Sequence, residues 1–267
     1  MKKAILIVSF GTTYPETRQK NIAAITRQVR ALYPDALVAE AVSSTIVRNA
    51  MKKREHIDAK SPEEGLLWLK EQGATHIVVF PTHVIDGIEN YRVKRVVEEY
   101  KTDFKQITVA DALLAKSCDY TNVAKALWES LKEKVGNAPL ILMGHGTEHT
   151  ADSSYAVMEQ ALQAYAQQPV YIATVEGKRT IADVIAQMQS EDIVNVRVVV
   201  APFMLVAGDH AHNDMAGNLF ITFTESGRDI ICRYYNKEPD GNPLWNRCRK
   251  RKSKANDPTG AGNHSCL

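Results

Sequence analysis

Short apolar runs rich in β-branched residues alternate along this chain with amphipathic stretches of ten to twenty residues. Such alternation is typical of βαβ units, in which helices cover a parallel sheet. The runs Ile77-Val78-Val79-Phe80 and Val198-Val199-Val200 have no polar alternation, as expected of strands buried on both faces. The predicted fold class is therefore α/β, with strands over residues 4–10, 36–42, 76–81, 106–110, 139–143, 170–174 and 196–203.

Helical signals fill the intervals between these strands. Ser61-Pro62-Glu63-Glu64 combines an N-cap serine, a proline at the first helical position and the glutamate of a capping box. Apolar residues from Val93 to Tyr100 recur at helical spacing, so a helix follows Glu89. We predict further helices over residues 15–32, 119–134, 151–166 and 179–190.

An internal repeat indicates two similar domains. Ser9-Phe10-Gly11-Thr12 ends the first strand, and Gly144-His145-Gly146-Thr147 ends a strand of the second half. Later in each half a strand runs into Pro81 or Pro202, and a glycine follows six positions on. In this alignment Glu89 lies opposite His210. We predict an N-terminal domain over 1–134 and a C-terminal domain over 135–217, each a parallel sheet flanked by helices, with a cleft between them.

The end of the chain, residues 218–267, has a different character. It gathers asparagines, a basic run and three of the four cysteines, and only residues 230–235 have the pattern of a strand. We predict an atypical basic tail and leave open whether it is partly disordered or a frame-shifted end. The cysteines form no CxxC pair, so neither a disulfide scaffold nor a cysteine zinc site is indicated.

Composition and charge exclude several classes of protein. The formal net charge of +2 and the 24% of charged residues argue against a dedicated nucleic-acid binder. The apolar run that follows Lys2 and Lys3 stops at Ser9, too early for a signal peptide, and no run is long enough to span a bilayer. We therefore expect a cytoplasmic protein with neither a nucleic-acid nor a membrane partner.

Three side chains at strand ends are the candidate metal ligands. His145, Glu89 and His210 follow strands at matching places of the two halves, and ligands of open α/β sheets bind beyond the carboxyl ends of the strands. Imidazole and carboxylate groups together suit first-row divalent cations. We therefore predict that the three converge on one cation in the cleft.

Each of these residues also has a simpler interpretation. A histidine at a strand end often makes only structural hydrogen bonds, but the glycines beside His145 permit close approach by a bulky ligand. His210 could be solvated beside helix-capping aspartates, and Glu89 could be a first-turn glutamate favoured by the helix dipole. For His83, a core role, support of a ligand and direct ligation stay open. We favour the metal-site interpretation.

Two further groups point to a substrate with carboxylates. The stretch from Ser9 to Thr13 lacks both GxxxxGK[ST] and GxGxxG, so its polar backbone is assigned to a ligand carboxylate rather than to a nucleotide. Basic clusters around Arg48 and Arg92 are either solvated helix faces or partners for such carboxylates.

Four stretches carry a resemblance to a known family: residues 7–12, Thr45-Ile46-Val47-Arg48, residues 143–146 and, most specifically, residues 202–215. They resemble the anaerobic sirohydrochlorin cobaltochelatases of the cobalamin pathway, a class II chelatase family, from residue 1 to about 216. The resemblance implies two α/β domains around a cleft and no nucleotide cofactor. It also implies that His145 and His210 are active-site histidines, Glu89 the metal-site acid and Glu176 a glutamate near the pocket. After Ala216 the sequence departs from the family's pattern.

The expected activity is insertion of Co²⁺ into a carboxylate-rich tetrapyrrole. An iron or nickel chelatase, or a non-catalytic carrier of metal or tetrapyrrole, are the alternatives. Oligomeric state stays open, with a homo-oligomer among the options. The predicted catalytic and metal-binding residues are His145, Glu89 and His210, with His145 as the main base. The predicted substrate-binding residues are Ser9, Phe10, Gly11, Thr12, Arg48, His83 and Glu176.

Overall fold

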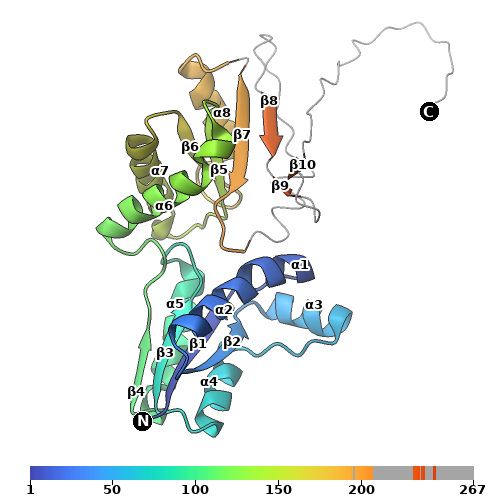
Figure 1. Ribbon diagram of the computed structural model, residues 1–267, viewed down its shortest axis with the longest axis vertical. Coiled ribbons are helices and arrows are strands. Elements are labelled where there is room, and N and C mark those ends of the chain that lie inside the picture. The colour runs from blue at the N-terminus through green and yellow to red at the C-terminus, as the bar shows by residue number, and fades with distance from the viewer. Residues whose placement is uncertain (195, 207–230, 235, 238–242, 245–267) are drawn as a thin grey trace, which may run out of the picture.

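Two parallel sheets, one above the other, make up the computed structural model (Figure 1), which describes residues 1–194, 196–206, 231–234, 236–237 and 243–244. The strand order is β2-β1-β3-β4 in the first sheet and β6-β5-β7-β8 in the second. The two orders are the same, with the earliest strand of each sheet in second place. The predicted α/β fold class is confirmed.

The first sheet and its helices run from the N-terminus to β4. Its strands are β1 (Lys3–Ser9), β2 (Leu37–Val42), β3 (His76–Pro81) and β4 (Gln106–Val109). Its helices are α1 (Pro15–Thr17), α2 (Ala23–Leu32), α3 (Thr45–Glu55), α4 (Pro62–Glu71) and α5 (Ile88–Glu99), with a π-helical turn over Arg18–Ile22 and a 3-10 turn over Lys101–Asp103.

The second sheet follows. Its strands are β5 (Leu140–Gly144), β6 (Val170–Thr174), β7 (Arg197–Pro202) and β8 (Ile231–Tyr234). Its helices are α6 (Ser117–Val135), α7 (Ser153–Ala166) and α8 (Ile181–Ser190), with a 3-10 turn over Thr150–Asp152. A short antiparallel pair, β9 (Asn236–Lys237) and β10 (Pro243–Leu244), comes last.

Alternation along the central strands explains why helices cover both faces of each sheet. In β1, Leu6 and its even-numbered neighbours pack against α4 and α5, while Ile5 and Ile7 pack toward Val29 of α2. In β5, Leu140 and Leu142 pack toward α6 and α7, and Ile141 and Met143 toward α8. Strands buried on both sides need apolar residues at every position, which accounts for the unbroken apolar runs of the sequence.

The sheet to which α6 belongs is decided by packing. Ala124 and Val135 of α6 lie in the same buried cluster as Leu140 and Leu162, and Figure 1 shows the helix beside the upper sheet. The first compact unit therefore ends between β4 and α6, before the predicted boundary near residues 134–138. β8, which pairs with β7, also lies beyond the predicted end of the second domain at residue 217.

The segment between β4 and α6 joins the two halves through a loop of the first. The N–H of Leu113 donates to the carbonyl of His83 at 3.0 Å, and that of Leu114 to the carbonyl of Val84 at 2.9 Å. Ile85 pairs with Leu114 in an isolated bridge, and both side chains are buried in the core of the second half. We call residues 83–85 and 112–114 together the junction.

The predicted elements agree with these bounds to within two residues for the seven strands of the two sheets up to β7. The capping box at Ser61 and Glu64 is also present. The predicted helix over 15–32 is interrupted by the π-helical turn over Arg18–Ile22. Residues 207–217 and most of the tail over 218–267 lie outside the described residues. Within the described part, no helix is both long and apolar enough to cross a bilayer.

Candidate active site between the two sheets

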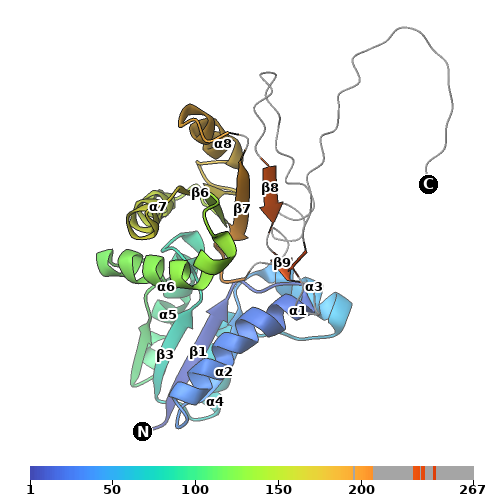
Figure 2. The same cartoon turned by 45° about the horizontal axis from the view of Figure 1, so that its top comes forward.

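The carboxyl ends of the two sheets face each other (Figure 1 and Figure 2), and a cavity of about 980 Å³ opens there. The first half lines it with the loop after β1, with α3 from Ile46 to Arg54 and with the segment from Thr82 to Arg92. The second half contributes the loops after β5, β6 and β7. Of the predicted site residues in the described part, those that line the cavity are Phe10, Gly11, Thr12, His83, Glu89, His145 and Glu176.

The loops after β1 and β5 present equivalent residues to this cavity. The rings of Phe10 and His145, which the internal repeat aligns, lie 6.5 Å apart at a tilt of 49°. Each is followed by a glycine in the left-handed region, Gly11 at φ 91° and Gly146 at φ 82°. Only glycine adopts this conformation readily, so both glycines are required by the backbone. The repeat thus places two rings opposite each other.

His145 is held with a defined tautomer. Its Nδ1 lies 3.0 Å from the carbonyl oxygen of Gly146, which only accepts, so Nδ1 carries the proton. The other nitrogen, Nε2, then presents its lone pair and lies 3.8 Å from Oε2 of Glu176. Both side chains are substantially exposed to the cavity, at 44% and 60%. An imidazole lone pair beside a carboxylate is a suitable pair of ligands for a divalent cation.

The backbones that carry His145 and Glu176 are tied together. The N–H of Glu176 donates to the carbonyl of His145 at 2.7 Å, and the N–H of Val175 to that of Gly144 at 3.0 Å. The buried carboxylate of Asp152 accepts the N–H of Thr147 on one oxygen and that of Lys178 on the other, each at 3.1 Å. These bonds form a clamp that fixes the two loops relative to each other.

Tyr155 of α7 supports the loop after β5, which carries His145. Its hydroxyl accepts the N–H of Gly146 at 3.4 Å, and burial raises the pKa of this phenol. It therefore stays neutral and able to hold the loop. Neither Asp152 nor Tyr155 was among the predicted site residues, because a side chain that supports a loop through the backbone of other residues has no sequence pattern of its own. The sequence signal that could have indicated them is their place just after the second glycine motif.

Glu89 lies at the opposite side of the cavity, in the first turn of α5. Its Oε1 is 2.5 Å from the guanidinium of Arg92, and its Oε2 accepts the hydroxyl of Ser43 at 3.4 Å. It also lines a second hollow of about 290 Å³ next to the main cavity. Glu89 is therefore held between one basic neighbour, Arg92, and one polar neighbour, Ser43.

Two predicted substrate-binding residues lie outside the cavity wall. Ser9 is the buried last residue of β1, and its carbonyl accepts the N–H of Ser43 as the sheet ends. Arg48 lines the smaller hollow instead. Its guanidinium donates to the carbonyls of Val42 at 2.5 Å and Ser43 at 3.0 Å. The helix α3 turns this side chain back onto the end of β2, so its guanidinium binds backbone carbonyls there and does not line the main cavity.

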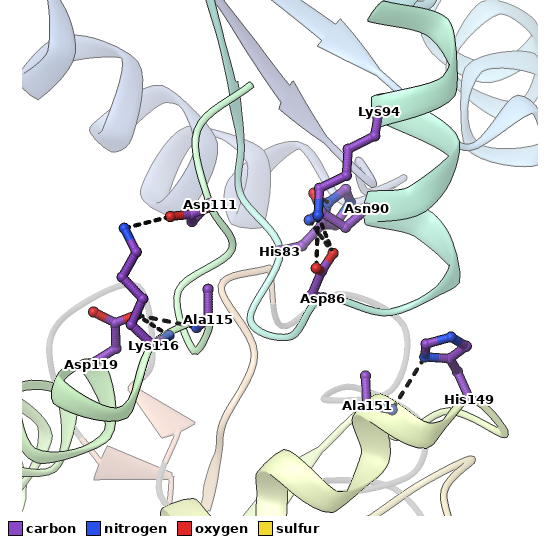
Figure 3. Close-up of polar contacts among 10 residues, drawn as sticks. All are labelled: His83, Asp86, Asn90, Lys94, Asp111, Ala115, Lys116, Asp119, His149 and Ala151. Carbon is purple, nitrogen blue, oxygen red and sulfur yellow. Dashed lines mark hydrogen bonds and ion pairs between the residues drawn. The ribbon is translucent and has the colours of Figure 1, made fainter. Parts of the chain in front are cut away.

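His83 lies in the junction and lines the cavity. Figure 3 shows its side chain next to Asn90 of α5, with Asp86 and Lys94 close to that amide. Its Nδ1 is 3.4 Å from Oδ1 of Asn90. Burial lowers the pKa of His83, so the imidazole is held neutral.

The third predicted metal ligand, His210, lies outside the described residues. Within the residues that the structure places, no three histidine, cysteine or carboxylate side chains gather as a metal site. His145 and Glu176 are thus a pair, and convergence with His210 stays a prediction.

The chain matches known chelatases over most of its length. A family model described as cobalt chelatase (CbiK) matches residues 3–230. The sirohydrochlorin cobaltochelatase of Salmonella typhimurium is 33% identical over 218 residues, which are 82% of this chain and 81% of that protein. Sirohydrochlorin cobaltochelatase CbiKC of Nitratidesulfovibrio vulgaris is 32% identical over 222 residues, 81% of this chain and 76% of the relative.

Solved structures share the fold. SirB from Bacillus subtilis with Fe3+ superposes with a TM-score of 0.58 at 19% identity, over 81% of this chain and 82% of that one. CbiX, the terminal enzyme of sirohaem biosynthesis in denitrifying bacteria, gives 0.51 at 17% identity over 80% and 84%. On the match of the family model and the identity to both relatives, this chain belongs to the cobalt chelatase (CbiK) family.

Proposed function

We propose that this metal chelatase inserts Co²⁺ into sirohydrochlorin, a tetrapyrrole with several carboxylates, in cobalamin biosynthesis. The names of the two relatives support the choice of metal and ring. The observation that carries the proposal is the pair formed by His145 Nε2 and Glu176 Oε2, 3.8 Å apart, in a cavity built by both halves.

The cation is assigned to His145 and Glu176, completed by His210 and Glu89. Nitrogen and oxygen ligands lie about 2 Å from a bound transition metal, so two ligands of one cation are roughly 3 Å apart. A separation of 3.8 Å reaches this value after a small rotation of either exposed side chain. Glu89, held by Arg92, faces the pair from the other half. It is placed to balance the charge of a cation that enters the cavity.

The ring is assigned to the wall of the first half. Phe10, Ile46 and Ile88 line the cavity with 43%, 82% and 44% of their surfaces exposed. Such exposed apolar side chains suit the flat face of a macrocycle. The guanidinium groups of Arg54 and Arg92 line the same cavity and suit the carboxylates at the ring's edge.

Metal insertion also requires the loss of two pyrrole N–H protons. His145 is assigned as the main base, because its Nε2 lone pair becomes free when the cation passes to the ring nitrogens and can then take up a pyrrole proton. Binding between the two walls would bend the macrocycle so that its nitrogen lone pairs point toward the cation. The cavity walls thus supply distortion, and His145 supplies basicity.

Further expectations from the sequence belong to this proposal. We expect no nucleotide cofactor, since both glycine-rich nucleotide patterns are absent from the loop after β1. We also expect no nucleic-acid partner, a cytoplasmic location and, as one option, a homo-oligomer. Addition of nucleotide to the assay below is expected to leave the rate unchanged.

The test is a spectrophotometric insertion assay on sirohydrochlorin with Co²⁺, Fe²⁺ and Ni²⁺ compared side by side. The expected result is multiple turnovers with cobalt as the fastest metal. Stoichiometric binding of ring or metal without insertion would identify a carrier and overturn the proposal. Faster insertion of iron or nickel would keep the chelatase and replace its metal.

A further inference from the structure

A chain of polar contacts runs from the surface of α5 to the imidazole of His83 (Figure 3). The ammonium of Lys94 donates to both oxygens of Asp86, at 2.8 and 2.7 Å. Asp86 Oδ1 accepts the amide of Asn90 at 2.7 Å, and Oδ1 of Asn90 lies 3.4 Å from His83 Nδ1. Asn90 is fully buried between the two.

The order of these groups determines the tautomer of His83. An ionised carboxylate only accepts hydrogen bonds, so the Asn90 amide must turn its NH₂ toward Asp86 and its oxygen toward His83. That oxygen also only accepts, so Nδ1 of His83 carries the proton. The hydrogen bonds from Lys94 lower the pKa of Asp86, so the carboxylate stays ionised. The donors and acceptors between Asp86 and His83 therefore keep this order. The lone pair is thus left on Nε2.

In the part of the chain that the structure describes, Nε2 of His83 has no hydrogen-bond partner. Among the residues that the structure describes, the buried side-chain polar atoms without a partner are His83 Nε2 and Thr82 Oγ1. The two are neighbours in sequence, and both residues line the cavity. Buried polar groups in folded proteins are nearly always satisfied, so two unsatisfied groups in one cavity wall indicate a ligand.

The chemistry of the lone pair selects which part of a tetrapyrrole it fits. Peripheral carboxylates offer only lone pairs and would be repelled by Nε2. A bare divalent cation would need charged partners, and in the described part His83 belongs to no group of three metal-binding side chains. The matching group is a polarised N–H, which a tetrapyrrole carries only at its centre.

We propose that His83 is the second proton acceptor of the reaction, with its Nε2 taking one pyrrole proton while His145 takes the other. This inference rests on the proposed function. In the step, the pyrrole N–H bond breaks, its electron pair forms the nitrogen–cobalt bond, and the proton binds Nε2. The imidazolium keeps its Nδ1–H on Asn90 and later returns the Nε2 proton to water in the cavity. Burial, which disfavours the charged form, promotes that return.

The test compares His83→Phe with His76→Phe. His76 begins the same strand, β3, at its other end, where its Nδ1 lies 3.0 Å from the Thr75 hydroxyl. With cobalt and sirohydrochlorin, His83→Phe is expected to lower the single-turnover insertion rate by about 100-fold, the usual size of a lost acid–base group. Its affinity for each of Co²⁺ alone and sirohydrochlorin alone is expected to stay as in the wild type. His76→Phe is expected to match the wild-type rate.

A second variant tests the tautomer without touching the imidazole. In ¹⁵N NMR spectra of the full chain, His83 is expected as the Nδ1–H tautomer, and Asp86→Asn is expected to yield a mixture because either amide orientation at Asn90 is then allowed. The insertion rate of Asp86→Asn should fall in proportion to the lost Nδ1–H population. An Nε2–H tautomer in the wild type overturns the proposal.

The remaining outcomes separate this inference from the proposed function. If the wild type inserts cobalt and His83→Phe does so at the same rate, the role of His83 is overturned and the proposed function is kept. Loss of Co²⁺ binding by His83→Phe in the absence of the ring makes His83 a metal ligand and also overturns it. A wild-type chain that inserts no metal overturns the proposed function first.

Discussion

The loop after β1 and the loop after β5 occupy equivalent places at the ends of two sheets with the same strand order. Each ends in a left-handed glycine, and their central rings face each other 6.5 Å apart. One ring is Phe10 and the other is His145. A repeated backbone thus supplies two matched positions, and a single side-chain difference gives one position an apolar ring and the other the imidazole that we propose as a metal ligand.

The surroundings of the two loops also differ: those of His145 are polar and fixed by hydrogen bonds, and those of Phe10 are apolar and exposed. Around His145, the buried Asp152 and Tyr155 hold backbone N–H groups in place. Around Phe10, the cavity wall includes exposed apolar side chains, with Ile46 at 82% exposure as the extreme. A cation needs ligands at set distances, whereas a large ring is bound by surface area. We therefore expect changes at the second-half wall to act on metal and chemistry, and changes at the first-half wall to act on ring affinity.

The largest effect is expected from His145→Phe, which makes the two loops alike. Removal of the proposed main base and metal ligand should lower kcat for cobalt insertion by about 100- to 1,000-fold. The fold should be retained, because the side chain is 44% exposed and packs in no core. Steady-state kinetics and a thermal unfolding scan check both points. A kcat within tenfold of the wild type would contradict the role of His145 as main base and metal ligand.

A smaller effect is expected when the clamp is weakened by Asp152→Asn. An amide keeps one acceptor but turns its NH₂ toward a backbone N–H, so the loops of His145 and Glu176 separate. Supporting groups of this kind typically change metal affinity by about 10-fold or more. The Kd of Co²⁺ for the protein alone, measured by calorimetry, should rise accordingly.

Glu159→Gln is the matched control for that variant. Glu159 is also a buried carboxylate of the α7 region, and it accepts the N–H of Ile172 in β6 and the guanidinium of Arg179. Arg179 belongs to the loop of Glu176, so these bonds hold one site loop and do not join it to the loop of His145. Both variants should lose about 1–3 kcal/mol of unfolding free energy in urea. Only Asp152→Asn should weaken cobalt binding, and equal losses of affinity would contradict the clamp.

Phe10→Ala tests the first-half wall. Loss of one aromatic contact with the ring should raise the KM for sirohydrochlorin by about 2- to 10-fold, the range of aromatic stacking energies. The Kd for Co²⁺ alone should not change. A variant with altered cobalt affinity and unaltered KM would reverse the assignment of the two walls.

The smallest effect is expected from Arg92→Ala, because its guanidinium is 67% exposed and screened by water. We expect the KM for the ring to rise about 2- to 3-fold at low salt and the difference to vanish at high salt. Arg48→Ala is the contrasting variant, since Arg48 donates to the carbonyls of Val42 and Ser43. It should lower the unfolding free energy and leave KM unchanged.

Sequence reasoning succeeded where burial of an element produces a simple apolar pattern in the sequence. The strands up to β7 were predicted because residues such as Ile77 and Val198 are apolar on both faces of a sheet. The placement of α6 was missed because Gly136, which ends the helix, also resembles a domain boundary. Which sheet a helix covers depends on packing and not on its end.

The candidate site was predicted less completely. Strand ends and glycines identified His145, Phe10 and Glu89, but the clamp joins Asp152 to Lys178 across 26 residues, and no local pattern records such a pairing. For Arg48, helical spacing indicated an exposed basic face, whereas the side chain folds back on the end of β2. The direction of a long side chain follows from tertiary contacts that periodicity does not contain.

The junction has a mechanical consequence. Each half has its own buried core, and residues 83–85 of the first are hydrogen-bonded to the linker segment that leads into the second. A rotation of one half against the other would pivot at this point and break no sheet hydrogen bond. His83 sits on the pivot itself, so a swing that widens the mouth for an incoming macrocycle would displace this imidazole less than side chains farther from the junction, such as His145.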